Sequence, residues 1–276
     1  MVALSPYTWG SFAVGQVGGE TRPGGGNTPV TRNDEERGGI PGPTLPCVLR
    51  ITDARSGERT DLPRGLTRVH VHPAGEDTSA LRLLLVADVL ARALDLDGSP
   101  SLTVARVGPE LRARADTLGI RRAEPEAPPG GRVLHVRGPG RPAPEDGPHL
   151  EVAPSGEPSG SPDPTALRLA LLSRPRHLPA EPDTGALSGA EWTLARWRRS
   201  VAGWAEHPSR PVPADVRGRL RAAWENDLDL PAALGVLREL DEEGDGAVPP
   251  GARFESYAYA DRLLGLELTR EIGTVY

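Results

Sequence analysis

Two periodicities of hydrophobic and polar residues alternate along the middle of the chain. Short runs such as 67–72 alternate polar with β-branched or apolar residues and predict strands. Longer stretches such as 78–94 repeat apolar residues every three or four positions and predict helices. Strands are expected at 47–51, 67–72, 102–107 and 132–136, and helices at 78–94 and 110–118. This order predicts a parallel βαβ arrangement and therefore an α/β fold.

From Pro164 onward the pattern is helical. Ser188 to Glu191 has the form of a capping box and predicts that a helix opens there. Pro231 suits the first turn of a later helix. Apolar residues at helical spacing mark the helices: Leu194, Trp197, Val201 and Trp204; Val216, Leu220 and Trp224; Leu234, Leu237 and Leu240; Tyr259, Leu263, Leu264 and Leu266. The tryptophans at 192, 197, 204 and 224 are predicted to pack in the core rather than to stack on bases.

Three segments follow from these patterns. Residues 1–45 are rich in Gly and Pro and are expected to form a flexible arm. Residues 46–163 form the α/β part, with 138–164 expected to be largely loop, and residues 164–276 form a helical part.

Composition narrows the function classes. The net charge is −6, which argues against a surface that grips nucleic acid throughout. The chain has no lysine, which excludes a P-loop and a Schiff-base lysine, and Cys47 is its one cysteine, which excludes an internal disulfide. No apolar run is long enough to span a membrane, so a cytoplasmic protein with no membrane partner is expected.

Each candidate binding site in the sequence also has a simpler interpretation, in which the same residues have only a structural role. His70 and His72 point to one face of a strand and could share a metal, but surface or core histidines are favoured because no third ligand is evident. Gly138 to Ala143 resembles a GxGxxA dinucleotide loop, yet Pro142 favours an ordinary turn because it lacks an N–H donor. Arginine outnumbers acidic residues between 168 and 221, which favours ion-paired helix faces over an RNA-facing surface.

Several stretches, in order along the chain, resemble cysteinyl-tRNA synthetase and its relative, the cysteine ligase of mycothiol synthesis. They are Leu49 to Asp53 with Gly57-Glu58, Val69 to Pro73, Arg82 with Asp88-Val89-Leu90, Asp163 to Ser173, Leu194 to Arg199, Asn226 to Leu234, and Leu263 to Leu266. The resemblance implies a bacterial protein with a reduced class I synthetase-type sheet domain (Rossmann-like, HUP), followed by an α-helical bundle. It also implies an ancestry of ATP-dependent amino-acid activation.

The departures from the family pattern lie at its phosphate-binding signatures. Where the resemblance places the HIGH histidines, the chain has Asp77-Thr78-Ser79-Ala80. Where it places the KMSKS loop, Pro158 to Ser161 follow Ser155-Gly156-Glu157 without lysine. His72 stands where the family has a zinc-binding cysteine, and the interval from Leu118 to His135 is too short for the remaining ligands.

The resemblance therefore predicts a vestigial nucleotide cleft formed by His72, Asp77, Thr78, Ser79, His135, Gly138 and Gly140. No catalytic residue, metal or cofactor is assigned. The predicted function is a degenerate synthetase-like protein, a pseudoenzyme retained to bind a protein partner or a small nucleotide-like ligand, or for a regulatory role.

Two alternatives remain. One is a ligase that uses ATP and Mg²⁺ to activate cysteine or another amino acid as an adenylate and passes it to an amine or tRNA, with His72, His135 and Arg82 or Arg106 replacing the lost groups. The other is an RNA-binding module in the helical part. The acidic total argues against tRNA as a partner.

Overall fold

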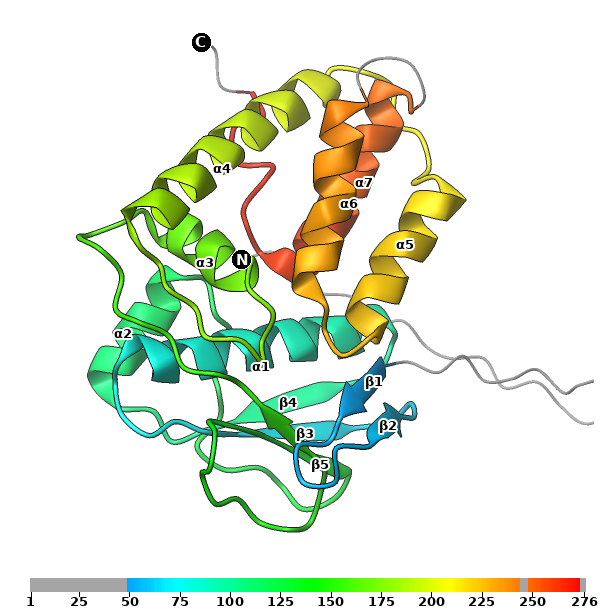
Figure 1. Cartoon of the computed structure of the whole chain (residues 1–276). Helices are drawn as coiled ribbons and strands as arrows, with labels where there is room; N and C mark the ends of the chain where they lie inside the picture. Colours follow the sequence, from blue (N-terminus) through cyan, green and yellow to red (C-terminus); the bar gives the residue numbers. More distant parts are fainter. Residues whose placement is uncertain (1–48, 244–247, 274–276) are drawn as a thin grey trace, which may run out of the picture. The chain divides into compact units, whose positions relative to one another are not determined.

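The computed structural model describes residues 49–243 and 248–273, which belong to one compact unit (Figure 1). The predicted arm at 1–45 and Cys47 lie outside these residues. The strands are β1 (Leu49–Thr52), β2 (Arg59–Leu62), β3 (Thr67–His72), β4 (Ser101–Val104), β5 (Arg132–Arg137) and β6 (His149–Glu151). The helices are α1 (Thr78–Leu96), α2 (Pro109–Thr117), α3 (Pro164–Leu172), α4 (Thr184–Trp204), α5 (Ala214–Glu225), α6 (Leu230–Glu242) and α7 (Pro250–Leu264).

The main sheet has four strands in the order β4-β3-β5-β6, and every pair is parallel. The chain passes from β3 through α1 to β4 on one side, and β5 then joins β3 on its other side. The direction of strand addition therefore reverses between β3 and β5. β1 and β2 form a separate antiparallel hairpin. The predicted α/β class is confirmed, and the short strand β6 lies inside the segment that was expected to be largely loop.

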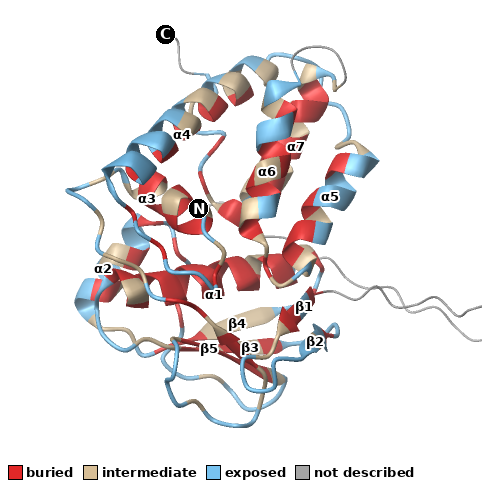
Figure 2. Cartoon of the chain, viewed as in Figure 1, coloured by how far each residue is buried: buried red, intermediate tan, exposed pale blue. Residues whose placement is uncertain are grey.

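Helix α1 is buried nearly all round because it lies between the sheet and the helices that follow (Figure 2). Val69 and Val71 of β3 are buried, and the alternating residues His70 and His72 point to the opposite face of the sheet. α1 contacts β3 on one side and α7 on the other. An apolar helix with few polar positions is the expected sequence for such a middle layer.

Aspartates cap the helices that begin at the main turns of the chain. Asp77 accepts a hydrogen bond from Ala80 N, and Asp163 and Asp229 cap α3 and α6 in the same way. Asp183 caps α4, so the predicted opening of this helix at Ser188 is wrong. The capping carboxylate lies five residues earlier, and the capping-box sequence falls inside the helix.

The tryptophans divide into buried and exposed residues. Trp197 and Trp224 are fully buried, and Trp204 packs against the core. Trp192 is 60% exposed, so its predicted place in the core is wrong. It lies on the outer side of α4, where its ring stacks under the guanidinium of Arg196 at 4.7 Å.

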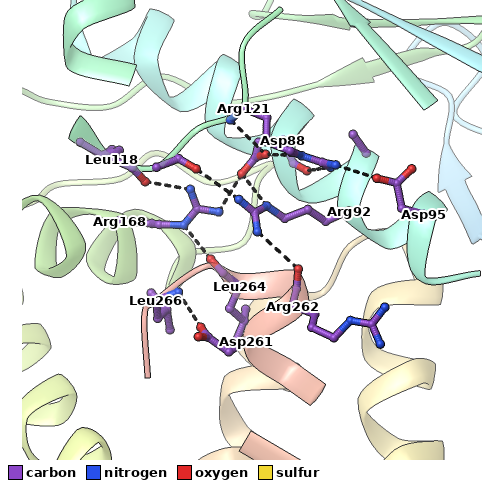
Figure 3. Close-up of polar contacts among 12 residues, drawn as sticks. Asp88, Arg92, Asp95, Leu118, Arg121, Arg168, Asp261, Arg262, Leu264 and Leu266 are labelled. Atoms are coloured by element: carbon purple, nitrogen blue, oxygen red, sulfur yellow. Dashed lines mark hydrogen bonds and ion pairs between the residues drawn. The ribbon is translucent and has the colours of Figure 1, made fainter. Parts of the chain in front are cut away.

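A buried ion pair joins α1 to the helical part (Figure 3). Arg168 of α3 donates to Asp88 of α1 at 2.8 Å, and both side chains are at most 1% exposed. Arg168 also donates to the carbonyls of Leu118 and Leu264, which brings α2 and α7 to the same point. Burial raises the pKa of Asp88, but the charges of Arg168 and Arg92 outweigh this effect and hold that pKa below its usual value.

The change from sheet to helices falls at Asp163, the cap of α3. Because one hydrophobic core includes residues from both parts, the predicted boundary between 163 and 164 stays a prediction. Among the described residues, no helix is long and apolar enough to cross a bilayer.

Removal of the buried carboxylate tests the role of the ion pair. We expect Asp88→Ala to lower the free energy of unfolding by about 3–5 kcal/mol, because it leaves a buried guanidinium without its counter-charge. Urea denaturation followed by circular dichroism measures the change.

The matched control is Asp116→Ala, which removes an exposed ion pair with Arg122. This variant should lose less than about 1 kcal/mol. Equal losses in the two variants would contradict a special role for Asp88.

Candidate functional site

A pocket of about 160 Å³ lies where the strand direction reverses, at the carboxyl ends of β3 and β5 and beside the start of α1. Ligands of open α/β sheets bind at this kind of position because the diverging connections leave a crevice there. Its lining residues come from the end of β3, the first turns of α1 and the segments after β5 and β6: His72, Ala74, Asp77, Ser79, Ala80, Leu83, Gly138, Pro139, Arg141, Val152 and Pro154.

Four of the residues predicted from the sequence line this pocket together, namely His72, Asp77, Ser79 and Gly138. Of the others, Thr78 is fully buried. His135 is buried beside His72, with His72 Nε2 and His135 Nδ1 2.9 Å apart.

Gly140 lies in a turn rather than at the pocket wall. Its φ is +63°, a conformation that glycine adopts without strain. Arg141 N donates to the carbonyl of Gly138 across this turn at 3.3 Å. The segment opens no helix, so the plain turn is the correct interpretation of Gly138 to Ala143 and the dinucleotide loop is not.

A carboxylate of the chain occupies the start of α1. Glu157 accepts from Thr78 N at 2.8 Å and from the Thr78 hydroxyl at 2.7 Å. Arg114 of α2 reaches the same carboxylate at 3.3 Å and also bonds Thr78 Oγ1. The hydrogen bonds from Thr78, and then the charge of Arg114, lower the pKa of Glu157, so its carboxylate is ionised at neutral pH.

Two of the N–H donors in the first turn of α1 are therefore bound by carboxylates of the protein itself. Asp77 holds Ala80 N, and Glu157 holds Thr78 N. In helices that bind phosphate, these N–H groups point at the ligand. Here two carboxylates stand at that place.

Three histidines lie side by side across the sheet on the face opposite α1. The strand register sets His70 beside His135 and His135 beside His149. Asp146 accepts from His135 Nε2 at 2.8 Å. Because an ionised carboxylate only accepts, the proton of His135 is on Nε2, and Nδ1 accepts from His72.

The tautomer of His149 follows in the same way. Arg137 Nε donates to His149 Nδ1 at 3.2 Å, so His149 Nε2 holds the proton and donates to the carbonyl of Pro144. His135 and His149 thus anchor the 138–148 loop to the sheet through Asp146 and Pro144.

Burial and repulsion between neighbouring rings lower the pKa values of His70, His72 and His135. Burial lowers the pKa of His70 and of His72, and the neighbouring His135 lowers both further. Burial also lowers the pKa of His135, although Asp146 acts in the opposite direction. Within residues 49–243 and 248–273, no three histidine, cysteine or acidic side chains form a group that could hold a metal ion.

The two arginines considered for a ligase mechanism lie away from the pocket. Arg82 is 1% exposed, and its terminal nitrogens donate to backbone carbonyls between Ala153 and Leu178. Burial, and then the charge of Arg174, lower the pKa of Arg82 to about 10. Arg106 pairs with Glu126 on the surface. Neither lines the pocket, and their use in a ligase mechanism stays a prediction.

The fold and the position of the pocket together define the class of protein architecture to which the chain corresponds. A Rossmann-like parallel sheet with a pocket at its switch point, followed by helices, is an α/β architecture of the class I synthetase type.

Comparison with known proteins gives particular relatives within that class. The chain is 38% identical over 108 residues to the L-cysteine:1D-myo-inositol 2-amino-2-deoxy-alpha-D-glucopyranoside ligase of Streptosporangium roseum. It is 39% identical over 111 residues to the ligase of the same name from Segniliparus rotundus, and 43% identical over 75 residues to that of Beutenbergia cavernae. These matches confirm the predicted resemblance to the cysteine ligase of mycothiol synthesis.

The matches are partial. They cover 38%, 39% and 27% of this chain, and 26%, 25% and 17% of the three relatives. The chain thus spans about a quarter of the length of the first two curated relatives it matches. No protein-family model matches the sequence.

Sequence reasoning missed Glu157, Arg114, Asp146 and Arg141 at or beside the pocket. Glu157 was noted only as the residue before the expected KMSKS position, and its contact with Thr78 spans 79 residues of sequence. Asp146 and Arg141 lie in a loop rich in Gly and Pro, where no periodicity marks a side chain as functional.

The histidine cluster should make the stability of the protein depend on pH. The pKa values of His70, His72 and His135 are lower in the folded chain, so the unfolded chain binds more protons below about pH 6.5. We expect full stability above that pH and a falling melting temperature as the pH drops through it. Thermal denaturation between about pH 7.5 and pH 5.5 measures this, since most carboxylates titrate lower.

Two variants distinguish the contribution of the histidine cluster to the pH dependence from that of other titrating groups. A double variant, His70→Gln with His135→Gln, should reduce the pH dependence. His177→Gln changes an exposed histidine and should keep the slope of the wild type. If the melting temperature of the double variant fell with pH as steeply as that of the wild type, the assignment of the pH dependence to the histidine cluster would be refuted.

Proposed function

We propose that this chain is a ligase-related protein that does not form adenylates and is retained for binding. The pocket at the ends of β3 and β5 is the place for a small, nucleotide-like ligand that has no triphosphate. The predicted loss of the HIGH and KMSKS signatures is part of this proposal, because amino-acid activation needs groups that stabilise charge on the transferring phosphorus.

The observation that carries the proposal is the carboxylate of Glu157 at the start of α1. It accepts from both the backbone and the hydroxyl of Thr78. Asp77 adds a second carboxylate at the pocket wall. A triphosphate at this helix start would meet like charges and would have to displace Glu157 from Arg114.

The ligase alternative has one supporting observation, which is the activity for which the relatives are named. Those proteins are named as ligases that join L-cysteine to an amino sugar linked to inositol. Under this alternative ATP and Mg²⁺ bind near α1 and Glu157 moves away. His72 and His135 are the groups at the pocket that could take part in transfer.

RNA binding by the helical part has weaker support. Arg196, Arg219 and Arg221 pair with Asp241, Glu239 and Asp97. Arg168 and Arg198 are buried against backbone carbonyls. These contacts favour structural roles for the arginines, as the ion-pair interpretation of the sequence predicted. A protein partner and a cytoplasmic location remain part of the proposal.

Titration calorimetry with ATP–Mg²⁺ and with a non-hydrolysable cysteinyl-adenylate mimic tests the proposal. We expect no heat from ATP–Mg²⁺ and no cysteine-dependent exchange of pyrophosphate into ATP. Heat from ATP together with exchange would overturn the proposal and establish the ligase. Tight binding of the mimic alone, without heat from ATP–Mg²⁺ and without exchange, would support a pocket for a nucleotide-like ligand that has no triphosphate.

Glu157→Gln is the matched variant, because it keeps the size of the side chain and removes its charge. If the carboxylate excludes the triphosphate, this variant should bind ATP–Mg²⁺ more tightly than the wild type, by about tenfold. Glu181→Gln, at an exposed carboxylate outside this pocket, should leave the titration unchanged.

A further inference from the structure

An acidic residue and two histidines form a hydrogen-bonded chain that ends at the pocket. We call Asp146, His135 and His72 the histidine relay. Asp146 Oδ1 lies 2.8 Å from His135 Nε2, and His135 Nδ1 lies 2.9 Å from His72 Nε2. His72 lines the pocket, whereas His135 and Asp146 do not.

The protons along the relay are fixed by its acidic end. Asp146 is ionised, because the hydrogen bond from His135 lowers its pKa, and it therefore accepts a hydrogen bond from the Nε2–H of His135. His135 Nδ1 is then an acceptor, and His72 must donate through Nε2. The remaining nitrogen of His72, Nδ1, carries a lone pair and bonds no described residue.

The groups around the relay favour a neutral His72. Burial lowers its pKa first, and His135, His70, His149 and Arg137 lower it further. A neutral imidazole with a free lone pair is the form that accepts a proton. Protonation at Nδ1 lets His72 pass its Nε2 proton toward His135, whose charge Asp146 then stabilises.

One cation shares the pocket with His72. Arg141 is the arginine among the lining residues, and its side chain makes no hydrogen bond with the described part of the chain. A guanidinium in a pocket can stabilise an oxyanion that develops during a reaction. A base that activates water and a group that stabilises the oxyanion are two of the elements that the hydrolysis of an activated acyl group needs in one pocket.

We propose that the pocket is a hydrolytic site for small activated esters or thioesters, with His72 as the general base and Arg141 as the oxyanion-stabilising group. His72 Nδ1 takes a proton from water while the water oxygen bonds to the acyl carbon. The tetrahedral oxyanion then re-forms the carbonyl, the bond to the leaving oxygen or sulfur breaks, and His72 returns the proton to it. The products are a carboxylic acid and an alcohol or thiol.

His135 and Asp146 are positioning residues, because they contact His72 or each other rather than the substrate. The inference rests on the proposed function, since it takes the same pocket as the ligand site. It adds a reaction class and needs no nucleotide.

The test uses the full chain and p-nitrophenyl acetate, with release of p-nitrophenolate followed by absorbance. The rate should exceed that of free imidazole at equal concentration and should rise with pH to a plateau, with a midpoint below about pH 6.5. His72→Gln keeps a donor toward His135 but has no titrating nitrogen, and it should lose about a hundredfold in rate. Arg141→Ala should lower kcat with little change in KM.

Asp146→Asn tests the positioning role through the pH profile. Without the carboxylate the relay holds a proton less well, so the midpoint should move to lower pH and the plateau rate should fall by about tenfold. A merely structural role would lower the rate and leave the midpoint in place. His177→Gln, at an exposed histidine away from the pocket, should match the wild type.

The inference is overturned if the wild type is no faster than free imidazole, or if His72→Gln equals the wild type in a folded state verified by circular dichroism. It is also overturned if His177→Gln loses as much as His72→Gln. Because the assay contains no ATP, ATP binding by calorimetry would refute the proposed function and leave this result intact. Failure of the hydrolysis assay in turn leaves the ATP titration unaffected.

Discussion

The arrangement of this protein depends on one buried carboxylate. Asp88 lies inside α1, and guanidinium groups from Arg92, Arg121 and Arg168 converge on it. Because the group is almost inaccessible to water, its charge must be matched within the protein. Gly265 shows how close the packing is: its φ is +62°, and a Cβ there would lie 2.9 Å from Arg168 Nη2. The ion pair thus fixes α1, α3 and the end of α7 relative to one another.

The position of α1 in turn determines the chemistry at its start. Since α1 is held between the sheet and the helices, its first turn lies at the carboxyl edge of β3 and β5, a place where open α/β sheets bind anionic ligands. The chain places Glu157 there instead, with Arg114 as its partner. At the same pocket, the side chain of His72 contacts His135 on the neighbouring strand, and His135 contacts Asp146 in the loop after that strand. A carboxylate thus binds the start of α1, and an imidazole lines the pocket beside it.

The sequence predicted elements better than it predicted contacts. Helices and strands with a strong period, such as 78–94 and 67–72, were correct because burial on one face imposes the period. The predicted start of α4 and the predicted burial of Trp192 were wrong. The first depends on which residue caps the helix in the folded chain, and the second on which elements pack against that side of α4. Of the candidate site, His72, Asp77, Ser79 and Gly138 meet at one pocket as expected. Arg82 does not, because buried backbone carbonyls use all the donors of its terminal nitrogens.

What the sequence determined by itself was local and compositional: the α/β order, the helical second part, the absence of lysine and the resemblance to the cysteine ligase family. These properties follow from spacing and residue type along the chain. What only the tertiary structure decided was which residues each polar side chain contacts. Thr78 meets Glu157 across 79 residues, Asp88 meets Arg168 across 80, and His72 meets His135 across 63. Such pairs depend on strand register and helix packing, which no local pattern encodes, because electrostatic partners are set by distance in space rather than in sequence.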